Sequence, residues 1–370
     1  MKINRISLFF FLFIGVILVL SGCQQDNSVQ RQEEKKTKSE TQPIQSVDIQ
    51  NGDFIRTIGW LSNNTVLLQK QTSGKTYLIR YQIFSGKSKT IFETSNTISE
   101  IKVSPDYEYF FVYAASNPNQ AGLTIYDSKT GDEIEHLEME PLAANFYWNQ
   151  ETPEKIMIVT YEHDFTFQAH AYNFKESTYE PIPISSPFVS WYSDHFYLEN
   201  RKSNKEELGN LYLEDTRSCE EESLILANIL QFATNRDLLI TMERSNRADA
   251  VTYDFHTTGF QTISKYEMPR EYDELGTFIP YFDLNFSKKM FASFEPYKSR
   301  KLKTLQGEYK LIVINPLTGK KSTVMELLDN RPLLSSPNGK YLLYGYQFER
   351  VIDVKQKKMS ELIVIPSKTY

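Results

Sequence analysis

Few stretches of this sequence have the residue types and spacing of a known catalytic or ligand-binding motif. The stretch Thr72-Ser73-Gly74-Lys75-Thr76 ends like a phosphate-binding loop, in which glycine amides and a lysine hold phosphate groups. That motif needs a second glycine five residues before Gly74, where Gln69 stands. We therefore expect this stretch to be a plain turn between two strands.

The histidines are too scattered along the chain to indicate a metal site. They are His136, His163, His170, His195 and His256. His163 and His170 are seven positions apart, so on one continuous strand they would face opposite sides. The sequence also has no G-x-S-x-G motif, no H-E-x-x-H motif and no closely spaced cysteine pair. We expect no catalytic constellation, no metal and no cofactor.

Cys23 is the residue with the clearest chemical role. It follows a 13-residue apolar run, Leu8 to Leu20, which is itself preceded by Lys2 and Arg5. A run of that length is typical of a secretory signal and is too short to span a bilayer. The stretch Leu20-Ser21-Gly22-Cys23 resembles the lipobox of bacterial lipoproteins. The resemblance implies cleavage between Gly22 and Cys23, acylation of Cys23, and a location at the cell membrane on the extracytoplasmic side.

The charge of the chain excludes some partners. Removal of the predicted signal peptide, residues 1–22, leaves 39 basic and 47 acidic residues, a formal charge of −8. Such a chain is not expected to bind nucleic acid through its overall charge. Cys219 is the other cysteine, so we expect no disulfide within the lipidated chain. Its predicted position is a turn beside Glu220, Glu221 and Glu222, whose negative charge argues against a reactive thiolate.

The domain organisation follows from a change in composition. Residues 23–46 are rich in Gln, Glu, Lys and Ser and contain no aromatic residue. Such a segment buries too little apolar surface to offset its ordering entropy, so we predict a lipidated, disordered tether. Residues 47–367 are rich in Tyr, Phe, Ile and Val, and their short alternating runs predict strands.

Two sequence phrases recur through residues 47–367. The first is an apolar residue, a polar turn and an aromatic or aliphatic strand, which predicts a hairpin. It occurs as WLSNNTVLL, VSPDYEYFF, WNQETPEKIMI, WYSDHFYL, FATNRDLLI, FSKKMFASF and SSPNGKYLLY. Trp60, Trp148 and Trp191 recur at one position of this phrase, so we interpret them as packing residues.

The second phrase follows each copy of the first and adds two more strands. It occurs as YLIRYQIFSGKSKTI, LTIYDSKTGDEI, AHAYNFKESTYEPI, NLYLEDTRSCEEESLIL, VTYDFHTTGFQTI, LIVINPLTGKKSTV and VIDVKQKKMSELIV. The copies are about 45 residues apart on average, the period of four-stranded propeller blades. We therefore predict an all-β fold, a β-propeller with seven units.

Particular residues of these hairpins resemble known propeller families. Val103-Ser104-Pro105-Asp106 and Ser336-Pro337-Asn338-Gly339-Lys340 are similar to the hairpins of TolB and of the dipeptidyl-peptidase class. With the lipobox and the length, the whole chain resembles the YqgU-like propeller lipoproteins of Bacillus-type bacteria. That resemblance implies six blades and supplies no catalytic residues. The blade number is therefore six or seven.

Two insertions exceed the repeat and are candidate binding loops. One, Glu271-Tyr272-Asp273-Glu274, is acidic, and the other is basic. The basic one contributes Lys298, Arg300, Lys301 and Lys303 as a possible partner-binding loop. The alternative is a solvated hairpin tip.

These observations favour a membrane-anchored, extracytoplasmic β-propeller lipoprotein that acts as a binding or scaffolding module. Its expected partner is an envelope protein or a wall component. The alternative is an extracytoplasmic hydrolase or lyase with its site in the propeller funnel. Because the sequence contains no recognisable set of catalytic residues, we prefer the binding module.

Overall fold

The computed structural model describes residues 42–48, 53–117, 120–140, 143–162, 164, 166–202, 206–303 and 306–364. The chain divides into two units, Met1–Gln42 and Pro43–Tyr370, and the second contains nearly all of the described residues. The predicted signal peptide, Cys23 and the predicted tether up to residue 41 lie outside the described residues. No helix in the described ranges is long and apolar enough to cross a membrane.

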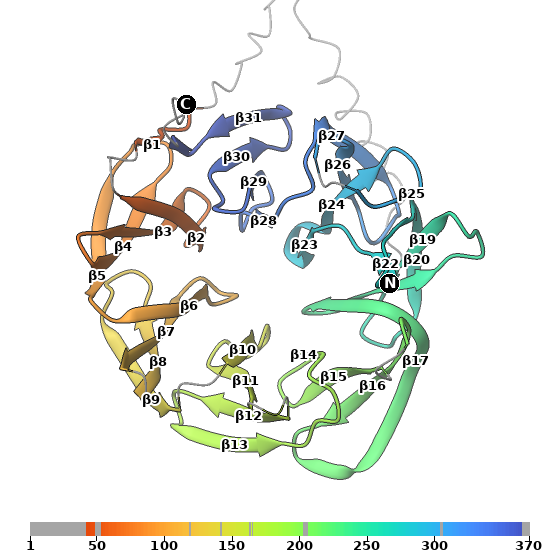
Figure 1. The fold of residues 1–370 in the computed structure, drawn as a ribbon, viewed down its shortest axis with the longest axis horizontal. Coiled ribbons are helices and arrows are strands. Elements are labelled where there is room, and N and C mark those ends of the chain that lie inside the picture. The colour runs from red at the N-terminus through yellow and green to blue at the C-terminus, as the bar shows by residue number, and fades with distance from the viewer. Residues whose placement is uncertain are drawn as a thin grey trace, which may run out of the picture. The chain divides into compact units, whose positions relative to one another are not determined.

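The Pro43–Tyr370 unit is a ring of antiparallel sheets around a central axis (Figure 1). In each sheet of the ring the strands follow chain order, and the first strand lies nearest the centre. The first three are unit 1, with β2 (Phe54–Trp60), β3 (Thr65–Thr72), β4 (Lys75–Gln82) and β5 (Ser88–Thr94); unit 2, with β6 (Thr97–Val103), β7 (Tyr109–Asn117), β8 (Gln120–Asp127) and β9 (Glu133–Met139); and unit 3, with β10 (Ala143–Trp148), β11 (Lys155–Tyr161), β12 (Phe167–Asn173) and β13 (Thr178–Ile182).

The last two sheets of the ring follow the same plan. They are unit 6, with β23 (Phe282–Asn285), β24 (Met290–Pro296), β26 (Tyr309–Ile314) and β27 (Lys321–Leu328); and unit 7, with β28 (Leu333–Ser335), β29 (Tyr341–Tyr344), β30 (Arg350–Asp353) and β31 (Lys358–Glu361). A 3-10 turn, η1 (Phe286–Lys288), follows β23. The described residues contain no α-helix, as the all-β prediction requires.

Units 4 and 5 are fused into one seven-stranded sheet. The strands are β14 (Val189–Trp191), β15 (Phe196–Arg201), β16 (Gly209–Asp215), β17 (Ser218–Asn235), β18 (Leu238–Arg244), β19 (Ala250–His256) and β20 (Thr262–Pro269). The first half of β17 pairs with β16 as the last strand of unit 4, and its second half pairs with β18 as the first strand of unit 5. The described strands therefore form seven four-stranded units, the number counted from the repeat, and units 4 and 5 share β17.

The predicted hairpins are confirmed in every unit. Each copy of the first phrase connects the first and second strands of a unit, and each copy of the second phrase supplies the outer strands. The stretch that resembles a phosphate-binding loop is the turn between β3 and β4. Two predicted turn positions are wrong. The turn of unit 4 lies at Thr216–Arg217, and Cys219 is the second residue of β17. In unit 3 the expected turn residue Thr178 is the first residue of β13.

The hydrophobic core consists of seven separate clusters, one between each pair of neighbouring units. For example, Phe111 of unit 2 stacks on Trp148 of unit 3, with ring centroids 5.3 Å apart. A four-stranded sheet has two apolar faces, and a ring lets each neighbour cover one of them. This arrangement explains the high aromatic content of the sequence.

Two short strands close the ring beside units 1 and 7. β1 (Val47–Asp48) pairs in parallel with β32 (Ile363–Val364). The Gln45 amide donates a hydrogen bond to the Ile83 carbonyl (2.7 Å), and Ile44 packs on the cluster between units 7 and 1. The compact unit thus begins at Pro43, four residues before the predicted boundary, because these residues find apolar and hydrogen-bonding partners on the propeller.

Candidate functional site

A central cavity of about 650 Å³ is the candidate functional site. Every unit contributes to its wall through its first strand or the turn that follows or precedes it. One lining residue from each unit, in chain order, is Trp60, Lys102, Trp148, Ser190, Arg236, Asp283 and Leu334. A cavity enclosed by many strand ends is a typical place for a ligand in a closed β fold.

Side-chain hydrogen bonds hold the first strands of neighbouring units together around this cavity. Such bonds, each from a side-chain donor to a backbone carbonyl of a neighbouring unit, occur at six interfaces. They are Trp60 Nε1 to Leu334 (3.1 Å), Lys102 Nζ to Phe146 (2.8 Å), Trp191 Nε1 to Tyr147 (3.0 Å), Thr234 Oγ1 to Trp191 (2.8 Å), Asn235 Nδ2 to Leu284 (2.6 Å) and Asn285 Nδ2 to Ser336 (3.1 Å). The cavity wall is therefore a connected ring of strands.

The three tryptophans are packing residues, as the repeat predicts. All three are buried, and Trp60 and Trp191 each donate a hydrogen bond across a unit boundary. The Trp148 indole donates to the Pro153 carbonyl within its own unit. Trp60 and Trp148 also form part of the cavity wall.

The hairpin turns at one end of the cavity hold non-glycine residues in the left-handed region. In the Ser336-Pro337-Asn338-Gly339 turn, Gly339 has φ +65°, and Tyr107 takes the same position in the Ser104 turn with φ +67°. Arg236 has φ +51° in the turn of unit 5. This conformation costs a residue with a side chain roughly 1–2 kcal/mol, which glycine avoids. Tyr107 and Arg236 therefore occupy the cavity wall at a conformational cost.

Three polar side chains from different units lie within electrostatic range of one another in the cavity. Burial raises the pKa of Tyr107, the charge of Asp283 raises it further, and Arg236 opposes both. Burial also raises the pKa of Asp283, although the Ser335 amide donates a hydrogen bond to its carboxylate (3.0 Å). Arg236 is exposed, and no residue in the described ranges accepts a hydrogen bond from its guanidinium or forms an ion pair with it. The cavity wall thus presents one unpaired cation.

The basic insertion has partners within the chain. Its strand β25 (Arg300–Lys301) pairs with β21 (Glu271–Tyr272) of the acidic insertion, and β22 (Thr277–Phe278) completes a three-stranded sheet. Glu271 is buried and accepts hydrogen bonds from Arg300 Nε (2.7 Å) and the Tyr309 hydroxyl (2.7 Å).

These contacts change the interpretation of the candidate binding loop. Arg300 also forms an ion pair with Glu308, and Lys301 lies 3.4 Å from Glu274. Arg300 is therefore a structural residue, and the two insertions neutralise part of each other's charge. Of the four predicted loop cations, Lys298 and Lys303 are left without an ion pair among the described residues.

The histidines have different surroundings from one another. His136 is hydrogen-bonded to Thr124 (2.8 Å), His170 stacks on Tyr179, and His195 lies 3.0 Å from the Asp194 carboxylate. His163 lies outside the described residues. His256 lies in a cluster with Glu243 and Asp254, away from the cavity, which the sequence analysis missed. A sequence pattern could have indicated this cluster. Thr241 and Glu243 alternate with apolar residues on one strand, and Asp254 and His256 do so on the next.

A closed ring of four-stranded antiparallel units around a central cavity defines a β-propeller. Residues 82–345 match the YqgU-like 6-bladed beta propeller domain, and the chain belongs to this family. The family is described as six-bladed, whereas the described strands of this chain form seven units, two of which share β17 in one continuous sheet.

Several known proteins are similar to this chain. The uncharacterized protein lmo1340 from Listeria monocytogenes EGD-e has 44% sequence identity to this chain. Its crystal structure superposes with a TM-score of 0.84 and covers 88% of this chain and 99% of that one. The uncharacterized lipoprotein YqgU of Bacillus subtilis (strain 168) is 25% identical over 97% of both chains. An oligogalacturonate lyase solved with manganese has a TM-score of 0.56 at 9% identity, over 79% of this chain and 86% of the lyase, a likeness of fold alone.

Proposed function

We propose that this chain is a lipid-anchored, extracytoplasmic propeller that binds an envelope protein or a wall component at the Arg236 end of its central cavity. The anchor is supported by the lipobox that ends at Cys23 and by the similarity to a protein named as a lipoprotein. Two acyl chains on one cysteine hold a protein at a membrane far better than one chain does.

The observation that carries the binding site is Arg236. It is an exposed cation in the cavity wall, it has no ion pair within the described residues, and its backbone is strained. The unpaired guanidinium favours an anionic group on the ligand. Tyr107 near it, and Trp60 and Trp148 elsewhere in the cavity wall, offer apolar contact.

The enzyme alternative has weaker support. Asp283 is the cavity carboxylate with a raised pKa, which is a common property of catalytic acids. Its contact with the Ser335 amide, however, joins unit 6 to unit 7 and gives it a structural role. We therefore propose binding and not catalysis.

Photocrosslinking in intact cells tests the location of the site. A photoreactive amino acid would replace Ser287 in the cavity wall, Lys303 in the basic insertion, or Tyr179 on the outermost strand of unit 3. We expect a specific adduct from position 287 and none from the other two. An adduct from position 303 alone would place the site at the insertion, and equal adducts from all three would reject a defined site.

A further inference from the structure

The interface between units 4 and 5 is unusual because polar groups replace part of its apolar core. Its cluster contains four buried apolar residues, Leu198, Leu211, Ile229 and Leu239, whereas every other interface has seven or more. Thr241 and Glu243 follow Leu239 on the same face of β18, and Asp254 and His256 lie beside them on β19. Burial of carboxylates at a packing interface is costly unless they are paired or bind a metal.

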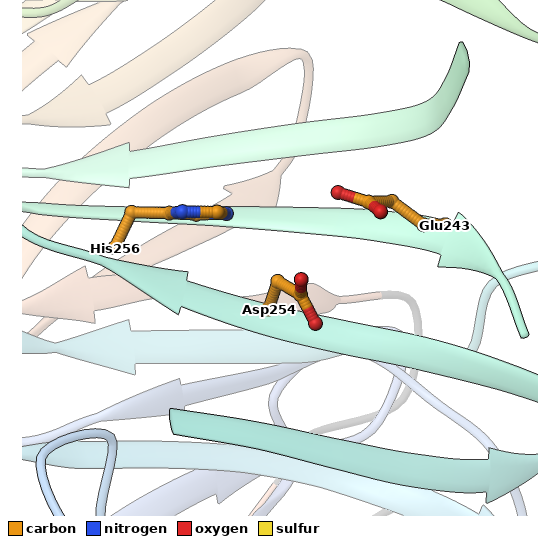
Figure 2. Close-up of side chains that lie close together, drawn as sticks. All are labelled: Glu243, Asp254 and His256. Atoms are coloured by element: carbon orange, nitrogen blue, oxygen red, sulfur yellow. The ribbon is translucent and has the colours of Figure 1, made fainter. Parts of the chain in front are cut away.

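Three side chains at this interface converge on one point. Glu243 extends from β18, and Asp254 and His256 extend from β19 toward it (Figure 2). One ligand atom from each lies within 4.8 Å of the others. Asp254 and His256 are 2% and 1% exposed, and Glu243 is partly buried.

The hydrogen bonds within the cluster leave one carboxylate oxygen without a partner. Thr241 Oγ1 donates to Glu243 Oε1 (2.9 Å) and therefore accepts from His256 Nε2 (2.9 Å), and His256 Nδ1 lies 3.4 Å from Thr262 Oγ1. A metal at His256 Nε2 would replace this contact with Thr241. Asp254 Oδ2 pairs with the Lys265 ammonium at 2.5 Å, whereas its buried Oδ1 has no hydrogen-bond partner among the residues that the structure describes. A buried oxygen of this kind lacks a donor or a cation.

The protonation states of the cluster suit a metal. Burial lowers the pKa of His256, which favours the neutral imidazole, the form that binds metals. Burial, with a smaller effect from the charge of Asp254, raises the pKa of Glu243, and a hydrogen bond from Thr241 opposes this.

We propose that Glu243, Asp254 and His256 form a binding site for a divalent transition-metal ion, which joins β18 to β19 on the face of unit 5 that packs against unit 4. One imidazole nitrogen with two carboxylate oxygens is a donor set for Zn²⁺ or Mn²⁺, whereas Ca²⁺ and Mg²⁺ prefer oxygen ligands alone. Atoms that share one such metal at about 2.0–2.2 Å lie about 3–4 Å apart, so only small side-chain movements are needed.

Lys265 is the competitor of the metal for Asp254. Its side chain is 60% exposed, so it has a route to solvent when a cation takes its place. The ammonium and the metal repel each other across a short distance. Removal of the Lys265 charge should therefore strengthen metal binding, a result that a purely structural ion pair would not give.

Calorimetric titration of the metal-free, detergent-solubilised full-length chain, purified without a histidine tag, tests the site with Zn²⁺ and with Mn²⁺ as separate probes. We expect one ion to bind per chain. Loss of a residue that only hydrogen-bonds to a metal ligand typically costs about 10–100-fold in metal affinity. Asp254→Asn and His256→Gln change the ligands themselves, so they should weaken binding by about 100-fold or more. Lys265→Met should bind more tightly than the wild type.

A matched control and a second readout separate binding from misfolding. Glu267→Gln removes a carboxylate of the same unit that lies outside the cluster and should leave the affinity unchanged. A saturating metal should raise the melting temperature of the wild type and of Lys265→Met but not of Asp254→Asn. If Asp254→Asn does not fold, the comparison of Lys265→Met with the wild type decides the question. Absence of wild-type binding to both ions, or equal affinity in all the variants, would overturn the proposal.

Discussion

Arg300 and Lys301 are adjacent cations with opposite surroundings. Arg300 pairs with the buried Glu271, whereas Lys301 and Glu274 are both exposed. Removal of one partner of a buried ion pair leaves the other charge buried and unpaired, which is costly. An exposed ion pair contributes little to the stability of the fold. The positive charge of the insertion is therefore mostly structural at Arg300 and dispensable at Lys301.

This contrast gives a prediction for two single variants. Arg300→Ala should lower the free energy of unfolding by about 3–5 kcal/mol, because Glu271 is left buried without its cation. Lys301→Ala should change it by less than about 0.5 kcal/mol. Urea denaturation of both variants measures the difference. Equal effects would show that the Arg300 pair is no more important than a surface contact.

Glu207 should make the stability of the protein depend on pH. Burial alone would raise its pKa, but hydrogen bonds from Arg244 and Thr277 outweigh burial and lower the pKa to about 2. Because the folded pKa lies below the unfolded value, the stabilisation is complete above about pH 4.5 and is lost as the pH falls toward 2. Its size is at most about 3 kcal/mol.

The corresponding variant is Glu207→Gln, with its exposed neighbour Glu206→Gln as the control. Glu207→Gln should melt below the wild type at pH 7, and the gap should narrow as the pH falls below about 4.5. Glu206→Gln should follow the wild type throughout. A gap for Glu207→Gln that stays constant from pH 7 to pH 3 would show that its charge is not responsible.

At the scale of elements, β1 and β32 join the two ends of the propeller sequence. The Val47 amide donates a hydrogen bond to the Leu362 carbonyl (2.8 Å), and Ile44 and Val47 pack on the cluster between units 7 and 1. Short elements of this kind hold a ring closed when no strand is exchanged between the first and last sheets.

Two deletions in the otherwise intact chain test the role of β1. Deletion of residues 27–41, all within the predicted tether, should leave the melting temperature unchanged. Deletion of residues 27–48 also removes β1 and should lower it by about 2–4 °C for each kcal/mol lost. Thermal melting followed by circular dichroism compares the two. A matching loss from the shorter deletion would mean that the tether itself packs on the propeller.

The elements themselves could be predicted from local sequence. Each unit repeats a hairpin with its own turn residues, such as Ser336-Pro337-Asn338-Gly339, and local turns need no knowledge of distant contacts. The fusion of units 4 and 5 was visible in principle, since β17 contains no glycine or proline. The pairing of β21 with β25 was not, because a parallel contact between two short insertions leaves no local pattern.

The candidate sites were harder to predict than the strands. The cavity wall needs one residue from each of seven units, so no single window of sequence contains it. The Glu243, Asp254 and His256 cluster depends on the register between β18 and β19, which pairs Leu239 with His256. That register follows from the turn between the strands, whereas the burial of the cluster depends on unit 4.

In the proposed whole molecule, lipid on Cys23 holds the propeller at the membrane. Cys23→Ala should abolish the incorporation of labelled fatty acid and leave the unprocessed precursor. A Ser21→Ala variant keeps a small residue before Gly22 and should be labelled and processed normally. Labelling of the Cys23→Ala protein would contradict the lipid anchor.

We propose that the partner binds at the Arg236 end of the cavity. Two glycine variants, compared for capture of the partner in intact cells, test this binding site. Arg236→Gly and Lys289→Gly both place glycine at φ +51° in an exposed turn, but only Arg236 lines the cavity. Relief of strain should leave both variants at least as stable as the wild type. We predict that Arg236→Gly loses capture of the species crosslinked from position 287, while Lys289→Gly retains it. Capture by Arg236→Gly at the wild-type level would contradict the claim.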